Sequence, residues 1–225
     1  MTDNDLFAAL SLAAVSVAAL HTIAPDHWAP FAAVSRARGW SAARTARVTL
    51  ACGFGHVTVS VGMGLLGLLF GLEVLKTVGE RMEALAGLLL VGFGVGYAVW
   101  GLRHATRHRL MHVHEPGHVH HGHGHSHDVG DPSRATVWSL FLLFSADPCV
   151  AVIPLLFAAA PLGVARTVVI VLLYEITTLA TMVLLVLPAR AGVHLLRGRW
   201  LDRYADVTAG GAIAAVGLAV TLLGW

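Results

Sequence analysis

The chain has few charged residues and only two cysteines. Asp, Glu, Lys and Arg together make up 12% of its 225 residues, whereas 56% are hydrophobic and the mean hydropathy is +0.73. These values lie far from those of soluble globular domains and predict a polytopic membrane protein that is embedded in a lipid bilayer. Cys52 and Cys149 both fall within apolar runs and are too few to form a disulfide framework.

Six apolar stretches are long enough to cross a bilayer, for which about 20 helical residues suffice. They cover residues 6–24, 48–71, 84–102, 135–165, 167–189 and 207–225, with Asp147 inside the fourth and Glu175 inside the fifth. Acidic residues precede the first stretch, where a secretory signal needs basic ones, so we expect it to be retained. We predict an all-α protein with six transmembrane helices, without room for a separate catalytic domain, and expect neither an enzyme nor a nucleic-acid partner.

Basic residues divide unequally between the two sides that six spans would define. One side has Lys76, Arg81 and Arg166. The other side has Arg36, Arg38, Arg44, Arg47, Arg103, Arg107, Arg109, Arg134, Arg190, Arg197, Arg199 and Arg203. Because an excess of Lys and Arg marks the cytoplasmic side, both termini are expected outside the cytoplasmic (inner) membrane and the loop between the third and fourth spans inside.

The two halves of the chain resemble each other in layout. Residues 6–35 and 135–165 each exceed the length of one span, and each pair of prolines, Pro25 with Pro30 and Pro148 with Pro154, interrupts its segment. Three helices in each half would give the halves opposite orientations, as in transporters built from inverted repeats. We therefore predict a 3+3 inverted repeat, with a proline-broken first helix in each half. The alternative is that these prolines only kink long helices.

This layout divides the chain into three parts. Residues 1–102 form the first three-helix repeat, residues 103–134 a cytoplasmic histidine-rich loop, and residues 135–225 the second three-helix repeat.

Ionisable residues inside the first broken segment are the main candidates for a functional site, because such residues are costly in hydrocarbon. On an unbroken helix, His21 and His27 would point about 120° apart. An unwound turn at Pro25 would bring Asp26 and His27 back toward His21. Together with His56 on the next span, these side chains suit nickel, cobalt or zinc better than ions that prefer oxygen alone. On its own, His56 would equally suit a buried, hydrogen-bonded packing role.

Four polar residues of the second half are secondary candidates for a transport site: Asp147, Cys149, Glu175 and Thr178. Asp147 and Cys149 occupy the second proline-containing segment, which matches the position of the first cluster. Cys149 would alternatively be a small buried residue, which is the commoner role of a free cysteine. Glu175 would either exchange protons or pair with an arginine near a helix end.

Residues 112–127 are dense in histidine, with eight in sixteen positions: His112, His114, His118, His120, His121, His123, His125 and His127. Such a tract cannot bury a core and is expected to bind late first-row divalent metals. His104, His108 and His112 would share one face if the third helix continued into the loop. In the cytoplasm this tract would collect ions for export, buffer imported ions or sense their level; a solvated linker is the alternative.

The segment from His21 to His27 resembles the H-x4-D-H signature of the nickel/cobalt transporter family. The segment from Gly55 to Thr58 is similar to the second motif of that family, and the histidine-rich tract resembles the loop of related nickel/cobalt efflux proteins. The resemblance implies transition-metal transport, with His21, Asp26, His27 and His56 as metal-binding positions.

These features together predict a secondary transporter for Ni²⁺ or Co²⁺, with Zn²⁺ as a further substrate and no resident cofactor. A homo-oligomer and a cytoplasmic metallochaperone are compatible partners. Three alternatives stay open: a thiol redox carrier with a related membrane fold, a membrane metalloenzyme that activates water on a bound ion, and an accessory metal-binding protein that transports nothing. The direction of transport is left open.

Overall fold

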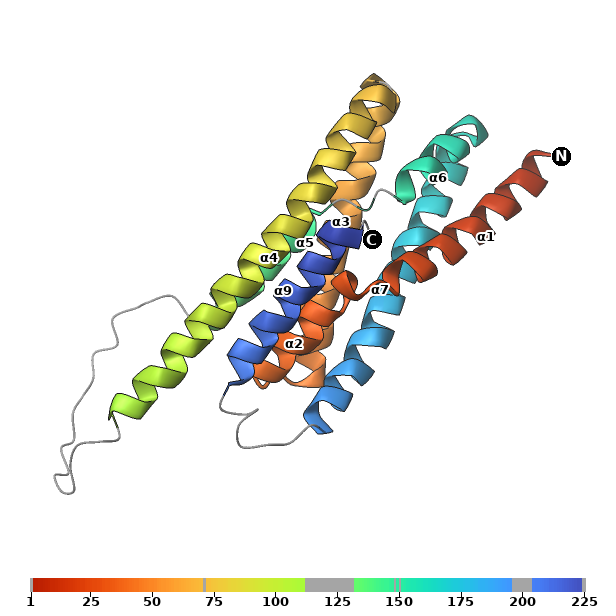
Figure 1. Cartoon of the computed structure of the whole chain (residues 1–225). Coiled ribbons are helices and arrows are strands. Elements are labelled where there is room, and N and C mark those ends of the chain that lie inside the picture. The colour runs from red at the N-terminus through yellow and green to blue at the C-terminus, as the bar shows by residue number, and fades with distance from the viewer. Residues whose placement is uncertain are drawn as a thin grey trace.

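The computed structural model describes residues 2–70, 72–111, 132–147, 149, 151–195 and 204–223. These residues are helical almost throughout and include no strand, which confirms the all-α prediction (Figure 1). The elements are α1 (Asp3–Thr22), η1 (Pro25–His27), α2 (Ala29–Ala37), α3 (Ala42–Phe70), α4 (Leu72–Met111), α5 (Pro132–Ser145), α6 (Val152–Ala159), η2 (Ala160–Leu162), α7 (Val164–Leu195) and α9 (Ala205–Leu223).

Four of these helices are long and apolar enough to cross a bilayer: Asp3–Thr22, Ala42–Phe70, Val164–Gly192 and Ala205–Leu222. Large hydrophobic side chains on their outer faces are exposed, including Leu69, Val164 and Leu184. Exposed apolar surface on this scale is what a lipid-facing protein presents. The expected third span lies within the longer helix α4, and the expected fourth span is divided between α5 and α6.

Both predicted helix interruptions are present. Helix α1 ends at Thr22, the short 3₁₀ helix η1 follows, and α2 begins at Ala29. Pro25 lies at the start of η1 and, lacking an N–H, cannot continue the hydrogen-bonding pattern of α1. In the second half, α5 ends at Ser145 and α6 begins at Val152.

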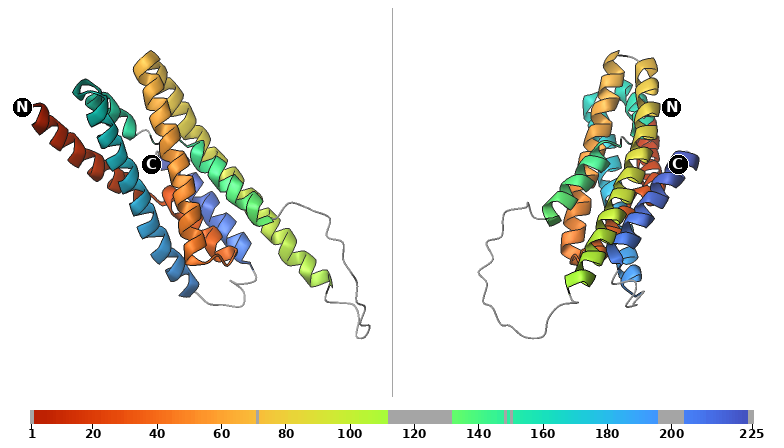
Figure 2. Two further views of the ribbon diagram at one scale, coloured as in Figure 1. Left: turned by 180° about the vertical axis from the view of Figure 1, so that it is seen from behind. Right: turned by 60° about the vertical axis from the view of Figure 1, so that its left-hand side comes forward.

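The two interrupted segments run in opposite directions. Arg38, at the end of α2, donates a hydrogen bond to the Thr136 hydroxyl near the start of α5 (3.1 Å). Arg166, at the start of α7 after α6, donates to the side-chain oxygen of Asn4 near the start of α1 (2.9 Å). The end of each interrupted segment therefore lies beside the start of the other, and Figure 2 shows the same antiparallel course.

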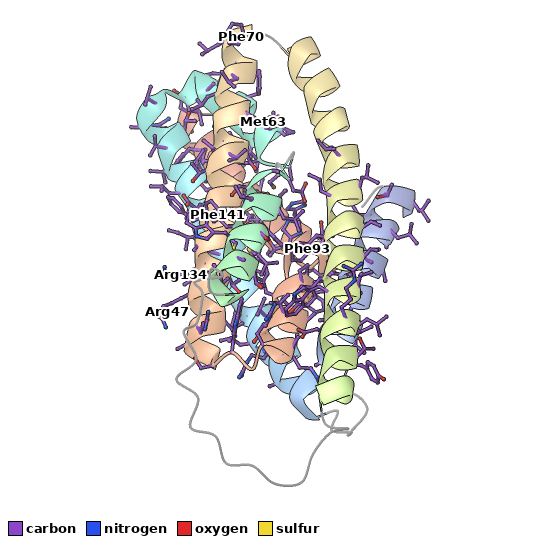
Figure 3. The ribbon with its side chains drawn as sticks, turned by 90° about the vertical axis from the view of Figure 1, so that its left-hand side faces the viewer. Arg47, Met63, Phe70, Phe93, Arg134 and Phe141 are labelled. Atoms are coloured by element: carbon purple, nitrogen blue, oxygen red, sulfur yellow. The ribbon has the colours of Figure 1, made fainter. Side chains whose placement is uncertain are left out.

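Arginines that are distant in the sequence lie at the same end of the bundle. Figure 3 shows Arg47 of α3 and Arg134 of α5 at one end, while Phe70 lies at the opposite end. Arg38 lies at the same end as Arg134, because it donates a hydrogen bond to Thr136 of α5. Its guanidinium lies 4.5 Å from the centroid of the Trp100 ring.

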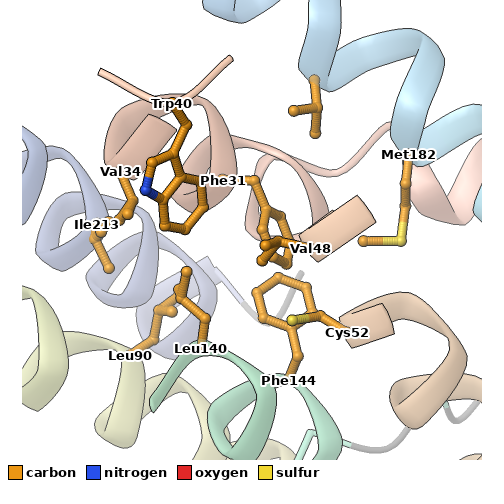
Figure 4. Close-up of a cluster of buried hydrophobic side chains, with 11 residues drawn as sticks. Phe31, Val34, Trp40, Val48, Cys52, Leu90, Leu140, Phe144, Met182 and Ile213 are labelled. Carbon is orange, nitrogen blue, oxygen red and sulfur yellow. The ribbon is translucent and has the colours of Figure 1, made fainter. Parts of the chain in front are cut away.

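The interior has two clusters of buried hydrophobic side chains. The first joins α1, α3, α6 and α7 and includes Ala14, Val57, Cys149, Ile153 and Tyr174. The second joins α2, α3, α4, α5, α7 and α9 and is drawn in Figure 4; it includes Phe31, Val34, Trp40, Cys52, Leu140, Phe144 and Ile213. Both clusters include residues of the first and the second half, so the two halves form one packed body.

Helices α4 and α9 approach each other closely through glycine. A Cβ atom added at Gly94 would lie 2.7 Å from the carbonyl oxygen of Gly210, and one added at Gly217 would lie 2.7 Å from the backbone nitrogen of Val91. Real Cβ atoms do not approach backbone this closely. Small residues at such crossings allow van der Waals packing of backbone on backbone, which is a major source of helix association in lipid.

We predict that Gly94→Ala destabilises the protein, because the new methyl group would meet the rigid backbone of α9. Overpacking of this kind costs about 1–3 kcal/mol. Gly92 and Gly96 lie on the same helix with open space around their Cβ positions. Their alanine variants are controls and should match or exceed wild-type stability, since alanine favours helix. Thermal unfolding in detergent measures the difference; equal midpoints for all three variants would contradict this packing.

Candidate metal centre

Three histidines that are distant in sequence come together inside the bundle. One ring nitrogen each from His21 of α1, His27 of η1 and His56 of α3 lie within 4.8 Å of one another. The ring centroids of His21 and His27 are 4.4 Å apart, and those of His27 and His56 are 5.3 Å apart. Among the residues that the structure describes, this is the group of three His, Cys, Asp or Glu side chains whose ligand atoms lie close enough to hold one metal ion.

The break after α1 is what allows His21 and His27 to meet. Six residues apart on a continuous helix, their side chains would diverge by about 120°. The turn at Ile23 and Ala24 and the 3₁₀ helix that follows fold His27 back, so that its ring contacts that of His21. The indole nitrogen of Trp28 donates to the carbonyl oxygen of Ile23 (3.0 Å) and ties the two sides of the break together.

Each of the three rings has a buried Nε2 atom that makes no hydrogen bond. His27 and His56 are only 3% and 2% exposed. Most buried polar side-chain atoms in proteins have a partner, and burying one without a partner costs free energy. Three such nitrogens in one cluster form a group that could hold a metal ion.

The opposite edges of two of these rings are hydrogen-bonded. His27 Nδ1 lies 2.9 Å from the Asp26 carboxylate, and His56 Nδ1 lies 3.1 Å from the carbonyl oxygen of Phe144. Both partners are acceptors, so each Nδ1 carries the proton and donates. In a neutral ring this leaves the Nε2 lone pair available to an ion, which is the usual arrangement of metal-bound histidine.

Asp26 lies on the outer side of His27, where it accepts the Nδ1 hydrogen bond. It also faces a small cavity of about 20 Å³, which Asp147 lines from the end of α5. This volume is about that of one water molecule. The two carboxylate residues, one from each interrupted segment, thus border the same space beside the imidazoles.

Of the other candidates of the second half, Cys149 lies between α5 and α6, whereas Glu175 and Thr178 lie on α7. Cys149 is 1% exposed, and its Sγ lies 2.7 Å from the Tyr174 hydroxyl. Thr178, one turn further along α7, has a buried hydroxyl without a hydrogen-bond partner. Glu175 is partly exposed and makes no hydrogen bond or ion pair with the described residues.

The two thiols are free and lie in different hydrophobic clusters, Cys149 in the first and Cys52 in the second. The geometry therefore gives no support to a pair of cysteines acting together. The eight histidines of residues 112–127 lie outside the described residues. Helix α4 does continue to Met111, so His104 and His108 fall on one helix as expected.

Sequence reasoning missed the residues that hold His56. Besides Phe144, Ser60 donates from its hydroxyl to the His56 carbonyl oxygen (2.7 Å) and accepts from the N–H of Cys149 (2.6 Å). A signal for Phe144 was available: in a helix its carbonyl would bond to the N–H four residues later, and that residue is Pro148, which has none. The serine gave no such signal.

No protein-family model, no curated protein and no solved structure matches this chain.

We predict that His21→Ala, His27→Ala and His56→Ala each lower the affinity for Co²⁺ by at least about tenfold, because each removes one nitrogen ligand. Asp26→Asn should have a smaller effect than the histidine variants, about tenfold or less, since an amide oxygen still accepts from Nδ1. Calorimetric titration of purified protein in detergent measures these affinities.

All samples should carry serine in place of the eight loop histidines, so that ions bound there do not mask the centre. Cys52→Ala is the matched control, because Cys52 lies one turn before His56 on α3 and is equally buried. Unchanged affinity in all three histidine variants would exclude this cluster as a metal centre.

Proposed function

We propose that the protein is a secondary transporter that moves nickel or cobalt ions across the cytoplasmic membrane. The observation that carries this proposal is the buried cluster of three Nε2 atoms without hydrogen-bond partners, beside a broken membrane helix. Half-unwound helices at membrane depth are tolerated where they line a site, and in transporters they form the substrate site.

The ligand chemistry favours a borderline divalent metal. Imidazole suits nickel, cobalt, copper and zinc, whereas sodium, magnesium and calcium are bound by oxygen. The carboxylates of Asp26 and Asp147 add negative charge beside the imidazoles. We therefore expect a partly dehydrated ion to bind His21, His27 and His56, with Asp26 orienting His27 or reaching the ion directly in another state of the transport cycle.

The size of the cluster fits one ion after a small contraction. Nitrogen ligands lie about 2.1 Å from an ion such as zinc, so two ligands of one ion are at most about 4.2 Å apart. The ring nitrogens lie within 4.8 Å of one another. Binding would therefore draw the rings together by about one ångström or less, which side-chain rotation would supply.

The antiparallel course of the two interrupted segments supports a transport cycle in which the site opens to each side of the membrane in turn. The first segment supplies His21 and His27, the second approaches His56 through Phe144, and both reach the middle of α3. Six spans arranged as a 3+3 inverted repeat would alternate access to this point by movement of one half against the other. Four helices are long and apolar enough to span a bilayer, and α4 and the α5–α6 pair would be the other two. This is compatible with six spans.

The resemblance of residues 21–27 and 55–58 to the motifs of the nickel/cobalt transporter family supports the same substrate. In the proposed orientation the arginine-rich end of the bundle faces the cytoplasm, together with the histidine-rich loop. The loop would deliver ions to the centre or receive them from it.

We expect purified protein in lipid vesicles to carry Ni²⁺ or Co²⁺ along its gradient, and His27→Ala to abolish the flux. An ion-sensitive dye inside the vesicles, with nickel, cobalt or zinc added outside, measures the rates. The double variant Cys52→Ala with Cys149→Ala should keep measurable flux, which separates metal transport from thiol chemistry. Full flux in His27→Ala vesicles would refute the proposed site.

Serine substitution of the eight loop histidines should change the concentration of ion at half-maximal flux more than the maximal rate. A tethered, weakly binding tract raises the local ion concentration without taking part in the translocation step. The same vesicle assay over a range of ion concentrations tests this. A loss of maximal rate with unchanged half-saturation would instead place the loop in the translocation step.

A further inference from the structure

The trio of imidazoles comes entirely from the first half of the chain, yet the second half contacts one of them. His21, His27 and His56 belong to α1, η1 and α3. The hydrogen-bond acceptor for His56 Nδ1 is the Phe144 carbonyl at the end of α5. In a protein whose halves move relative to each other, such a contact links movement to the geometry of the ion site.

Two hydrogen bonds connect the second break to one turn of α3. Phe144 accepts from the His56 ring at 3.1 Å, and the N–H of Cys149 donates to the Ser60 hydroxyl at 2.6 Å. Ser60 lies four residues after His56 and donates to its carbonyl oxygen. Phe144 lies in the last turn of α5 and Cys149 lies within the α5–α6 break, so this region contacts α3 at the level of His56.

These contacts depend on a close approach of α3 and α5. A Cβ atom added at Gly55 would lie 2.6 Å from the Ser145 hydroxyl oxygen and 2.9 Å from the Phe141 ring. A larger side chain at Gly55 would force the Ser145 side chain and the Phe141 ring to shift, and we expect this to displace α5 from α3. The Phe144 carbonyl would then move out of reach of His56 Nδ1, because that bond already spans 3.1 Å.

The contacts of the second break are fully buried. His56 is 2% exposed, and Ser60 is not exposed at all. Because these groups lie away from water, solvent would not take the place of the Phe144 carbonyl when the helices separate. A His56 ring without that acceptor is free to rotate or to carry its proton on Nε2, and a protonated Nε2 cannot bind metal.

We propose that the second half of the chain sets the ion affinity of the trio by holding the His56 ring at Nδ1 through the Phe144 carbonyl, with Ser60 and Gly55 as positioning residues. This inference rests on the proposed metal site. In it, contact between α5 and α3 orients Nε2 toward the other two imidazoles and keeps affinity high. Withdrawal of the second half releases the ring and lowers the affinity, which couples ion release to the conformational change.

Two substitutions test the proposal without removing any ligand. We expect Gly55→Ala and Ser60→Ala each to weaken Co²⁺ binding about tenfold or more, the size observed when groups that orient metal ligands are lost. The experiment uses full-length protein with serine at the eight loop positions, titrated with Co²⁺ by calorimetry. Thermal unfolding of each metal-free variant shows whether it is folded.

Two matched controls lie on the same helix. A Cβ atom at Gly53 would crowd the flexible ends of Leu179 and Met182 of α7, at 2.7 and 2.8 Å, but not α5. Thr49 has a buried hydroxyl that makes no hydrogen bond to the second break. Gly53→Ala and Thr49→Ala should therefore bind Co²⁺ within about threefold of the wild type. Equal losses in test and control variants would mean that only general packing of α3 matters, and would overturn the proposal.

A spectroscopic measurement on the metal-free protein decides the mechanism separately. Nitrogen-15 NMR of labelled histidine reports which ring nitrogen carries the proton, and the His56 signals are identified by their loss in His56→Ala. We expect protonation at Nδ1 in the wild type and increased protonation at Nε2 in Gly55→Ala. Protonation at Nε2 in the wild type, or no change in the variant, would refute the proposal.

The outcomes separate this inference from the proposed function. If the wild type binds no Co²⁺ outside the loop, the metal site itself fails. If it binds Co²⁺ through the three histidines while Gly55→Ala and Ser60→Ala bind as tightly as the controls, only the role of the second half fails.

Discussion

The burial of three imidazole Nε2 atoms without hydrogen-bond partners is the constraint on which the rest of the site depends. In an apolar bundle, burying each such nitrogen raises the free energy of the folded protein, and van der Waals packing does not offset this. The Asp26 carboxylate and the Phe144 carbonyl accept hydrogen bonds from the Nδ1 atoms of two rings, which in the neutral rings leaves Nε2 without a proton. Coordination of a divalent ion by the three nitrogen lone pairs would offset that free energy.

The need to pair buried polar groups also relates the helix breaks to the site. A helix interrupted in hydrocarbon leaves backbone groups unpaired, and these must find partners within the protein. Here some of them serve the site. The carbonyl of Phe144 has no helical N–H to bind, because residue 148 is proline, and it accepts from His56 instead. The N–H of Cys149 binds Ser60. Backbone groups left without helical partners at the second break thereby hydrogen-bond to His56 and Ser60, and His56 lies beside the first break.

Much of this arrangement was predictable from the sequence, because membrane helices and their interruptions leave strong signals. Apolar runs located the helices, although α3, α4 and α7 extend beyond the runs, since helical hydrogen bonding does not require apolar side chains. Pro25 predicted the first break, and the residues around it predicted the meeting of His21, His27 and His56. Spacing alone could not predict that Asp26 faces the Nδ1 edge of His27, because that depends on the side-chain rotamers within η1. Nor could it predict that Ser60 would join the second break to α3, because that depends on how separate helices pack.

The account is tested most directly by locating the ion itself. Anomalous X-ray scattering from crystals of the full-length protein grown with Co²⁺ should show a peak about 2.1 Å from Nε2 of His21, His27 and His56 together. A peak confined to the histidine-rich loop, or a cluster in which these rings face lipid, would contradict the central claim.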